Sequence, residues 1–267
     1  MELTSLITEL RGKTLTLFLN RPNTRNALNT CLVEEILYVL NKAESNESIV
    51  AMIITGKGKD FCSGRDLNEA HRLQTLPLQE RRYAYYKIAE LFNKIATLKI
   101  PTIAAVQGCA YAGGFALAAV CDILVATEDA KFCVPEGKIG VVPGTVTPPL
   151  FRALGPRKAT ELILTGDVLE SKEALGIGFV NKVVSSDMLL ETALSISERI
   201  ASSSPTAIRM WKENVVGLER GDFRSFVFGF AEIVTLMSFS DDASEGLRAF
   251  VEKRRPKWCE GSPKLEV

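Results

Sequence analysis

The sequence is poor in histidine and has no excess of charge of either sign. His71 is the one histidine among 267 residues, which excludes a metal site built from several imidazoles. Lys plus Arg and Asp plus Glu both number 32, so the overall charge favours neither nucleic acid nor an acidic surface as a partner. We therefore expect no metal site and no nucleic-acid partner, and His71 itself is expected to lie on the surface.

Paired cysteines and long apolar runs are also absent. No run approaches the roughly 18 apolar residues of a membrane helix, and the N-terminus lacks the charged and apolar regions of a secretory signal. The cysteines show no CxxC spacing, and most lie in apolar or small-residue segments, as is typical of reduced, buried thiols. They are Cys31, Cys62, Cys109, Cys121, Cys133 and Cys259. We expect a soluble cytoplasmic protein without a membrane partner.

The composition is otherwise that of a globular protein. Hydrophobic residues make up 46% of the chain and charged residues 24%, so extended disorder is not expected. Strand, turn and helix patterns alternate over residues 1–186, which favours an α/β fold with mostly parallel strands and helices outside. The expected elements are paired strands at 5–10 and 13–20 (the second half-exposed), a helix from an Asn29 cap to about residue 43, a buried strand at 49–55, a helix near 79–97, a strand at 102–106, a helix from Gly114 and a strand at 123–126.

Residues 187–267 are expected to be helical. The expected helices are 187–203, 205–219, 222–238 and 242–253. The third is apolar nearly all round its circumference, and such a helix needs cover on more than one face. Neighbouring subunits would provide this cover, with burial inside one subunit as the alternative. We therefore divide the chain into a core, residues 1–186, and a C-terminal helical oligomerisation region, residues 187–267.

A glycine pair, Gly113 and Gly114, precedes a helix of small residues. The first N–H groups of a helix have no intrahelical acceptor, and glycine lets a ligand oxygen approach them closely. The pair is therefore suited to hold a negative charge that develops on an oxygen atom. Alternatively, the glycines only allow the strand and the helix to pack tightly.

A second glycine motif, Gly64-Arg65-Asp66, follows a buried strand and precedes a helix-forming stretch. Asp66 is expected to cap that helix. Judged alone, the motif is most simply explained as a capped loop.

Taken together, the segments 61–67 and 105–122 and the Pro135-Glu136 step resemble the enoyl-coenzyme A hydratase/isomerase (crotonase) superfamily. The resemblance runs from about residue 5 to about residue 260. It implies a spiral of ββα repeats followed by a helical C-terminal region. It further implies an acyl-CoA substrate, no cofactor beyond the coenzyme A of that substrate, and a homotrimer or hexamer.

The resemblance also implies which residues are catalytic. The backbone N–H groups of Arg65 and Gly113 would form the oxyanion hole, and Glu136 would transfer protons. Apolar neighbours such as Phe132 and Val134 are expected to raise the pKa of Glu136 into a useful range.

Ala116 occupies the position where two-carboxylate hydratases of this family have their other glutamate. Moving a double bond from the 3- to the 2-position needs one base, whereas adding water is helped by two carboxylates. We therefore expect double-bond isomerisation. Hydration with Glu136 alone, decarboxylation and hydrolysis are alternatives, and a non-catalytic relative that binds RNA or a protein is a further one.

Further residues are assigned to binding by the same resemblance. Arg25 is the candidate partner of a coenzyme A phosphate, with a solvated loop arginine as the alternative. Phe250 and Lys253 would touch coenzyme A near the C-terminus of the chain. The remaining residues assigned to substrate binding are Ser63, Asp66 and Leu67.

Two features depart from the family pattern. Arg65 stands where a small residue is frequent, so its side chain either binds a substrate carboxylate or lies on the pocket rim. The segment 141–150 contains prolines and β-branched residues where many hydratases are rich in glycine. This leaves the length of the acyl group open.

Overall fold

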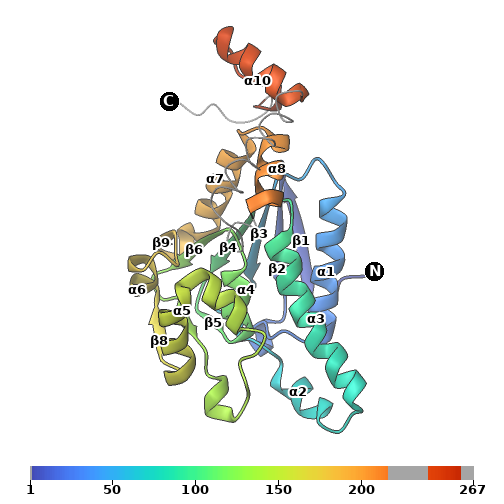
Figure 1. Cartoon of the computed structure of the whole chain (residues 1–267), viewed down its shortest axis with the longest axis vertical. Helices are drawn as coiled ribbons and strands as arrows, with labels where there is room; N and C mark the ends of the chain where they lie inside the picture. The colour runs from blue at the N-terminus through green and yellow to red at the C-terminus, as the bar shows by residue number, and fades with distance from the viewer. Residues whose placement is uncertain (1, 216–239, 260–267) are drawn as a thin grey trace.

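The chain folds around a twisted central sheet (Figure 1), as seen in a computed structural model that describes residues 2–215 and 240–259. This sheet has six strands in the order β1-β2-β3-β4-β6-β9. β1 and β2 are antiparallel, and all the other neighbours are parallel. The strands are β1 (Leu6–Arg11), β2 (Thr14–Leu19), β3 (Ala51–Gly56), β4 (Thr102–Val106), β6 (Ile123–Thr127) and β9 (Lys182–Val184). The predicted α/β class with mostly parallel strands is confirmed.

A second, smaller sheet has three strands, in the order β5-β7-β8. β5 (Cys109–Tyr111) is parallel to β7 (Lys131–Cys133), and β7 is antiparallel to β8 (Val168–Glu170). The chain alternates between the sheets, since β4 and β6 of the large sheet are each followed directly by a strand of the small one. Because β5 and β7 pair in parallel, their C-terminal ends lie side by side.

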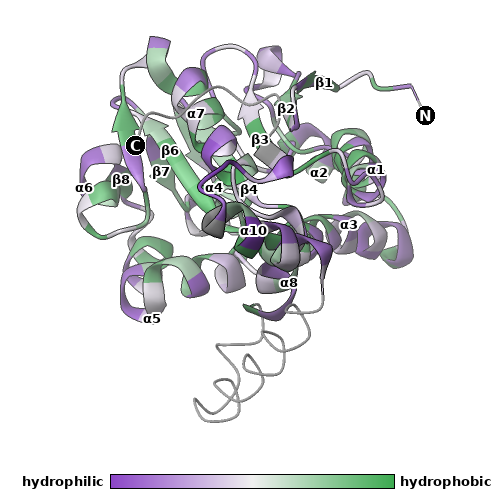
Figure 2. Ribbon diagram, turned by 90° about the horizontal axis from the view of Figure 1, so that it is seen from above, coloured by the Kyte–Doolittle hydropathy of each residue, from purple (hydrophilic) through white to green (hydrophobic). Residues whose placement is uncertain are grey.

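Helices cover both faces of the large sheet. α1 (Thr30–Glu44) and α3 (Leu78–Thr97) lie next to each other, with hydrophilic outer surfaces (Figure 2). The Asn29 side chain caps α1 as predicted, because its Oδ1 accepts from the Leu32 N–H at 2.9 Å. On the other face, α7 (Leu189–Ala201) packs on β3, β4 and β6 and closes a smaller core.

The strand predicted at 13–20 is not half-exposed as expected. β2 is buried along most of its length. Its polar positions, Thr14 and Thr16, are only 4% and 3% exposed, because α7 covers that face and the Thr14 hydroxyl donates to Ser197 Oγ at 2.8 Å. Threonine at alternate positions of a strand indicates a solvent-facing side only where no helix covers that side of the sheet.

The remaining helices include α5 (Thr147–Thr165) and α6 (Ser171–Gly176), which were not predicted from the sequence. The others are η1 (Pro22–Thr24), α2 (Leu67–Leu73), α4 (Gly113–Ala119), η2 (Glu136–Ile139), η3 (Ser186–Met188), α8 (Pro205–Val215), α10 (Asp241–Val251) and η5 (Lys257–Cys259). The predicted helix at 222–238 lies outside the described residues, and the boundary at residue 186 stays a prediction. No helix in the described part of the chain is long and apolar enough to cross a membrane.

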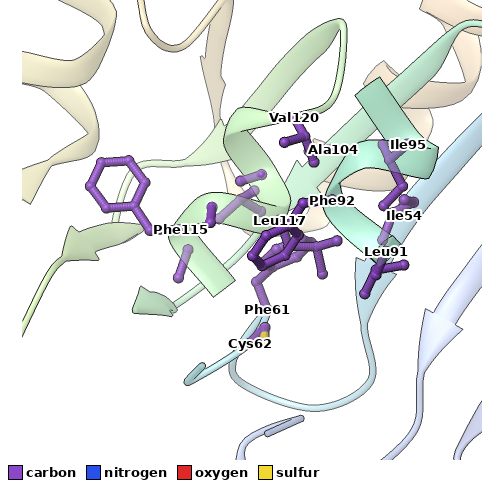
Figure 3. Close-up of a cluster of buried hydrophobic side chains, with 14 of the residues drawn as sticks. Ile54, Phe61, Cys62, Leu91, Phe92, Ile95, Ala104, Phe115, Leu117 and Val120 are labelled. Atoms are coloured by element: carbon purple, nitrogen blue, oxygen red, sulfur yellow. The ribbon is translucent and has the colours of Figure 1, made fainter. Parts of the chain in front are cut away.

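The main core includes buried side chains of α3, of α4 and of the segment that follows β3. Figure 3 shows Phe92 of α3 and Leu117 of α4 beside Phe61, which follows β3. Cys62 is buried in the same cluster, and burial raises the pKa of its thiol to about 12. It is a free thiol, as are Cys31, Cys109, Cys121 and Cys133.

An ion pair between a buried lysine and a partly exposed aspartate ties α8 to the sheet. Lys212, only 2% exposed, donates from Nζ to the Ile100 carbonyl at 2.7 Å and to Asp122 Oδ2 at 2.5 Å. The same Asp122 oxygen accepts from the N–H and hydroxyl of Thr102 at 2.6 and 2.8 Å. Burial lowers the pKa of Lys212, and the Asp122 carboxylate opposes that shift.

Replacing Asp122 by Asn should lower the free energy of unfolding by about 3 kcal/mol, because it leaves the Lys212 ammonium buried without an anion. Urea denaturation measures this loss. Glu213→Gln is the matched control on the same helix: Glu213 pairs with Lys99 at 3.0 Å, and both side chains are about half-exposed. That change should cost less than about 1 kcal/mol. Equal losses for both variants would contradict this account.

Candidate active site

The helix α4 begins at a tight turn after β5. Ala112 precedes the helix with φ 51° and ψ −121°, a conformation that residues with a side chain rarely adopt. The Ala112 N–H donates to the Cys133 carbonyl at the end of β7, at 2.8 Å. Gly113 is the first residue of α4, so its N–H has no acceptor within the helix.

The loop at 62–66 lies directly beside this turn. Its main chain is bound to β5, since the Cys62 N–H donates to the Cys109 carbonyl at 3.0 Å and the Tyr111 N–H donates to the Cys62 carbonyl at 2.9 Å. On the other side, the Leu28 N–H donates to the Gly64 carbonyl, and the Asp66 N–H donates to the Leu28 carbonyl. This bridge leaves the intervening Arg65 N–H outside the ladder.

The N–H groups of Arg65 and Gly113 border the same small space. A Cβ placed on Gly113 would lie 3.7 Å from the Arg65 nitrogen, and one placed on Gly64 would lie 3.1 Å from the Gly113 nitrogen. Two backbone donors that converge at a helix N-terminus form the arrangement that stabilises an oxyanion.

The two glycines of the pair have different surroundings. A Cβ on Gly114 would lie 2.0 Å from the Cys62 carbonyl oxygen, so Gly114 is needed for packing. A Cβ on Gly113 would meet Leu28 Cδ1 at 3.3 Å and would otherwise face the space between the donors. The packing explanation therefore fits Gly114, and the oxyanion explanation fits Gly113.

Glu136 lies at the start of the turn η2, after Pro135. Its side chain is 9% exposed, and Oε2 is buried with no hydrogen-bond partner in the described part of the chain. Burial raises the pKa of Glu136, and a hydrogen bond from its own backbone opposes the shift. A buried carboxylate with a raised pKa is a stronger base than an exposed glutamate, which suits a group that accepts and returns a proton.

Main-chain pairing and aromatic packing position Glu136 relative to α4. Tyr111 of β5 pairs with Cys133 of β7 in the small sheet. Cys133 lies three residues before Glu136 in the chain. Phe115 of α4, Phe132 of β7 and Phe179 form a triad with ring centroids 5.2 to 5.3 Å apart. The N-terminus of α4 and the Glu136 turn are therefore fixed in one unit.

Ala116 provides no second carboxylate. It is fully buried in the main core, one turn into α4, and its N–H donates to the Ala112 carbonyl at 3.1 Å. Glu136 therefore has no acidic partner on this helix.

The other residues of the 61–67 motif have structural contacts. Asp66 caps α2 as predicted, accepting from the N–H groups of Asn68 and Glu69, and it pairs with Arg21 at 2.8 Å. Ser63 donates from its hydroxyl to the Thr24 carbonyl at 3.3 Å, and Leu67 is 62% exposed. Binding roles for Asp66, Ser63 and Leu67 stay predictions.

The residues assigned to coenzyme A are dispersed. The Arg25 guanidinium is paired with Asp60 at 2.8 Å and its side chain is 56% exposed, while Lys253 is exposed after α10. The side chain of Phe250 lies outside the described residues. His71 is exposed on α2, as expected, and no cluster of residues suited to a metal occurs in 2–215 or 240–259.

The Arg65 side chain lies against Tyr85 of α3, with Cζ 4.2 Å from the ring centroid. Sequence reasoning missed Tyr85, because no motif marks it. The signal was limited to an unusual arginine and a tyrosine-rich helix.

A model of the enoyl-CoA hydratase/isomerase family matches residues 11–261. The chain belongs to this family. A putative enoyl-CoA hydratase of Thermus thermophilus is 36% identical over 93% of this chain and 98% of its own. The short-chain-enoyl-CoA hydratase of Clostridium acetobutylicum is 34% identical, covering 96% of this chain and 97% of its own. The 2,3-dehydroadipyl-CoA hydratase of Escherichia coli is 34% identical, covering 95% and 98%.

Solved structures of the enoyl-CoA hydratase/isomerase family share the fold. An enoyl-CoA hydratase from Shewanella pealeana superposes with a TM-score of 0.91 at 29% identity, covering 96% of this chain and 97% of its own. The AtuE protein of Pseudomonas aeruginosa gives 0.92 at 28% identity, covering 96% and 99%. The predicted crotonase fold with a helical C-terminal region is confirmed, and the chain is an enzyme of this family.

Gly113→Val should lower turnover roughly a hundredfold or more, because the added side chain enters the space between the two N–H donors. The variant should remain folded, since the nearest atom to the new Cβ is the flexible end of Leu28. Steady-state kinetics and thermal unfolding test both points. Gly176→Ala, where a Cβ meets nothing within 4 Å, is the control and should change neither. Gly113→Val that loses stability but keeps its specific activity would make Gly113 a packing residue.

Proposed function

We propose that this enzyme moves the double bond of a 3-enoyl-CoA to the 2-position, with Glu136 as the single acid–base group. One observation carries the proposal. A buried carboxylate with an unpaired oxygen follows a strand that is hydrogen-bonded to the turn carrying one of two converging N–H donors, and the fully buried Ala116 stands where a second carboxylate would be expected.

The proposed reaction needs no net supply of protons. Glu136 takes a proton from C2 of the substrate, and the electrons of that C–H bond pass through the thioester carbonyl onto its oxygen. The Arg65 and Gly113 N–H groups stabilise this oxyanion in a site with little water. The protonated Glu136 then returns its proton at C4, the carbonyl re-forms, and the double bond lies between C2 and C3.

Hydration of a 2-enoyl-CoA is the second candidate. It is favoured by the names of the relatives, several of which are called enoyl-CoA hydratases. In that case Glu136 alone would activate the water and protonate C2, without a second carboxylate to position the water molecule. This should make hydration slower than isomerisation.

Coenzyme A binding and subunit assembly are further parts of the proposal. Arg25 can reach a coenzyme A phosphate only while sharing or exchanging its pairing with Asp60. We propose a cytoplasmic homotrimer or hexamer that uses no cofactor beyond the coenzyme A of its substrate. Exposed apolar side chains on and beside η2 and α5 support the assembly, namely Ile139, Val142 and Leu164.

Glu136→Gln should lower turnover by roughly two to four orders of magnitude, because the amide keeps the shape of the side chain but removes its basicity. The native rate should fall as the pH drops through the raised pKa of Glu136, since only the ionised form accepts a proton. Its midpoint should lie above the ordinary glutamate value of about 4.3. Glu170→Gln, which changes a half-exposed carboxylate, is the control and should leave turnover unchanged.

The same assays separate the two candidates. The native enzyme is given a 3-enoyl-CoA and a 2-enoyl-CoA of equal length, and the products are read by proton NMR. Migration of the double bond should be the faster reaction. Fast hydration without detectable isomerisation would overturn the one-base isomerase and leave hydration by Glu136.

A further inference from the structure

The guanidinium of Arg65 is buried, and no anion among the described residues pairs with it. Its Nε, NH1 and NH2 atoms are all buried and have no hydrogen-bond partner within the described residues. The one contact that offsets the charge is the ring of Tyr85, 4.2 Å from Cζ. A tyrosine face cannot accept the several N–H bonds that a guanidinium donates.

The neighbouring carboxylates are already engaged elsewhere. Asp66 accepts from Arg21 and caps α2. Glu69 accepts from the Thr30 N–H at 3.1 and 3.2 Å. Glu136 also has an unpaired oxygen, yet it makes no hydrogen bond with the Arg65 guanidinium. The Arg65 guanidinium and Glu136 Oε2 thus each lack a hydrogen-bond partner among the described residues.

The position of this cation relative to the oxyanion hole restricts what can bind it. Arg65 provides an oxyanion N–H from its backbone, so its guanidinium lies within one arginine side chain, at most roughly 7 Å, of the residue that holds the thioester oxygen. The phosphates of coenzyme A are separated from the thioester by the whole pantetheine arm. An anionic group of the substrate that reaches the Arg65 guanidinium therefore belongs to the acyl part.

We propose that Arg65 selects acyl-CoA substrates whose short acyl chain ends in a carboxylate. This rests on the proposed acyl-CoA function and adds the class of acyl group. A carboxylate matches the planar fork of donors on a guanidinium and can accept two parallel bonds from it. A chain that ends in a methyl group would cover the guanidinium without pairing it, which disfavours such substrates.

Calorimetric titration with two saturated thioesters of equal length tests this without turnover. Glutaryl-CoA ends in a carboxylate, and pentanoyl-CoA ends in a methyl group. The native protein should bind glutaryl-CoA at least about tenfold more tightly. Equal affinities, or tighter binding of pentanoyl-CoA, would overturn the role of Arg65 and leave the proposed acyl-CoA function standing. If neither thioester bound, the proposed function itself would fail.

Two arginine variants locate the effect. Arg65→Met keeps a long side chain without the charge and should bring the ratio of the two affinities to about one. Arg82→Met is the matched control, because Arg82 also lies over a tyrosine of α3, with Cζ 4.8 Å from the ring centroid of Tyr86. It should leave the ratio as in the native protein. A preference for glutaryl-CoA that survives in Arg65→Met would assign carboxylate binding to another residue and contradict the proposal. If Arg65→Met does not fold, the native titration alone decides.

Discussion

The site depends on one main-chain hydrogen bond, from the Ala112 N–H to the Cys133 carbonyl. This bond continues the pairing of β5 with β7 by one residue beyond the end of β5 and joins the turns that follow the two strands. One turn leads into α4 and presents the Gly113 N–H, and the other leads through Pro135 to Glu136. Because Ala112 adopts its unusual backbone conformation at this point, the Gly113 N–H and the Glu136 turn are held in one rigid frame.

That frame keeps Glu136 in an environment that opposes its ionised form. An unpaired carboxylate in a buried site costs stability at neutral pH, and the cost is absent below the unfolded pKa, where both states are protonated. As the pH rises through the raised folded pKa, the native state releases its proton and the cost is reached in full. The surrounding core offsets it, since Phe115, Phe132 and Phe179 pack beneath the two turns. In the proposed mechanism, activity and stability thus make opposite demands on Glu136.

Local signals in the sequence were sufficient for much of this architecture. The Asn29 and Asp66 caps and the positions of α3 and β4 followed from residue types and spacing. The sequence could not reveal features that depend on contacts between distant segments. The burial of β2 depends on α7. The difference between Gly113 and Gly114 depends on the Cys62 carbonyl. The burial of the Arg65 guanidinium involves Tyr85 on α3. Each of these becomes visible only when the partner segment is in place.

The central claim is that the oxyanion donors and Glu136 together remove a proton from the carbon next to a thioester. Incubating the enzyme with a saturated acyl-CoA in deuterium oxide measures this step alone, because no double bond is needed for enolisation. Mass spectrometry should show deuterium entering at C2 with the native enzyme and much less with Glu136→Gln. The claim is contradicted if the native enzyme exchanges no hydrogen at C2, or if the variant exchanges it equally fast.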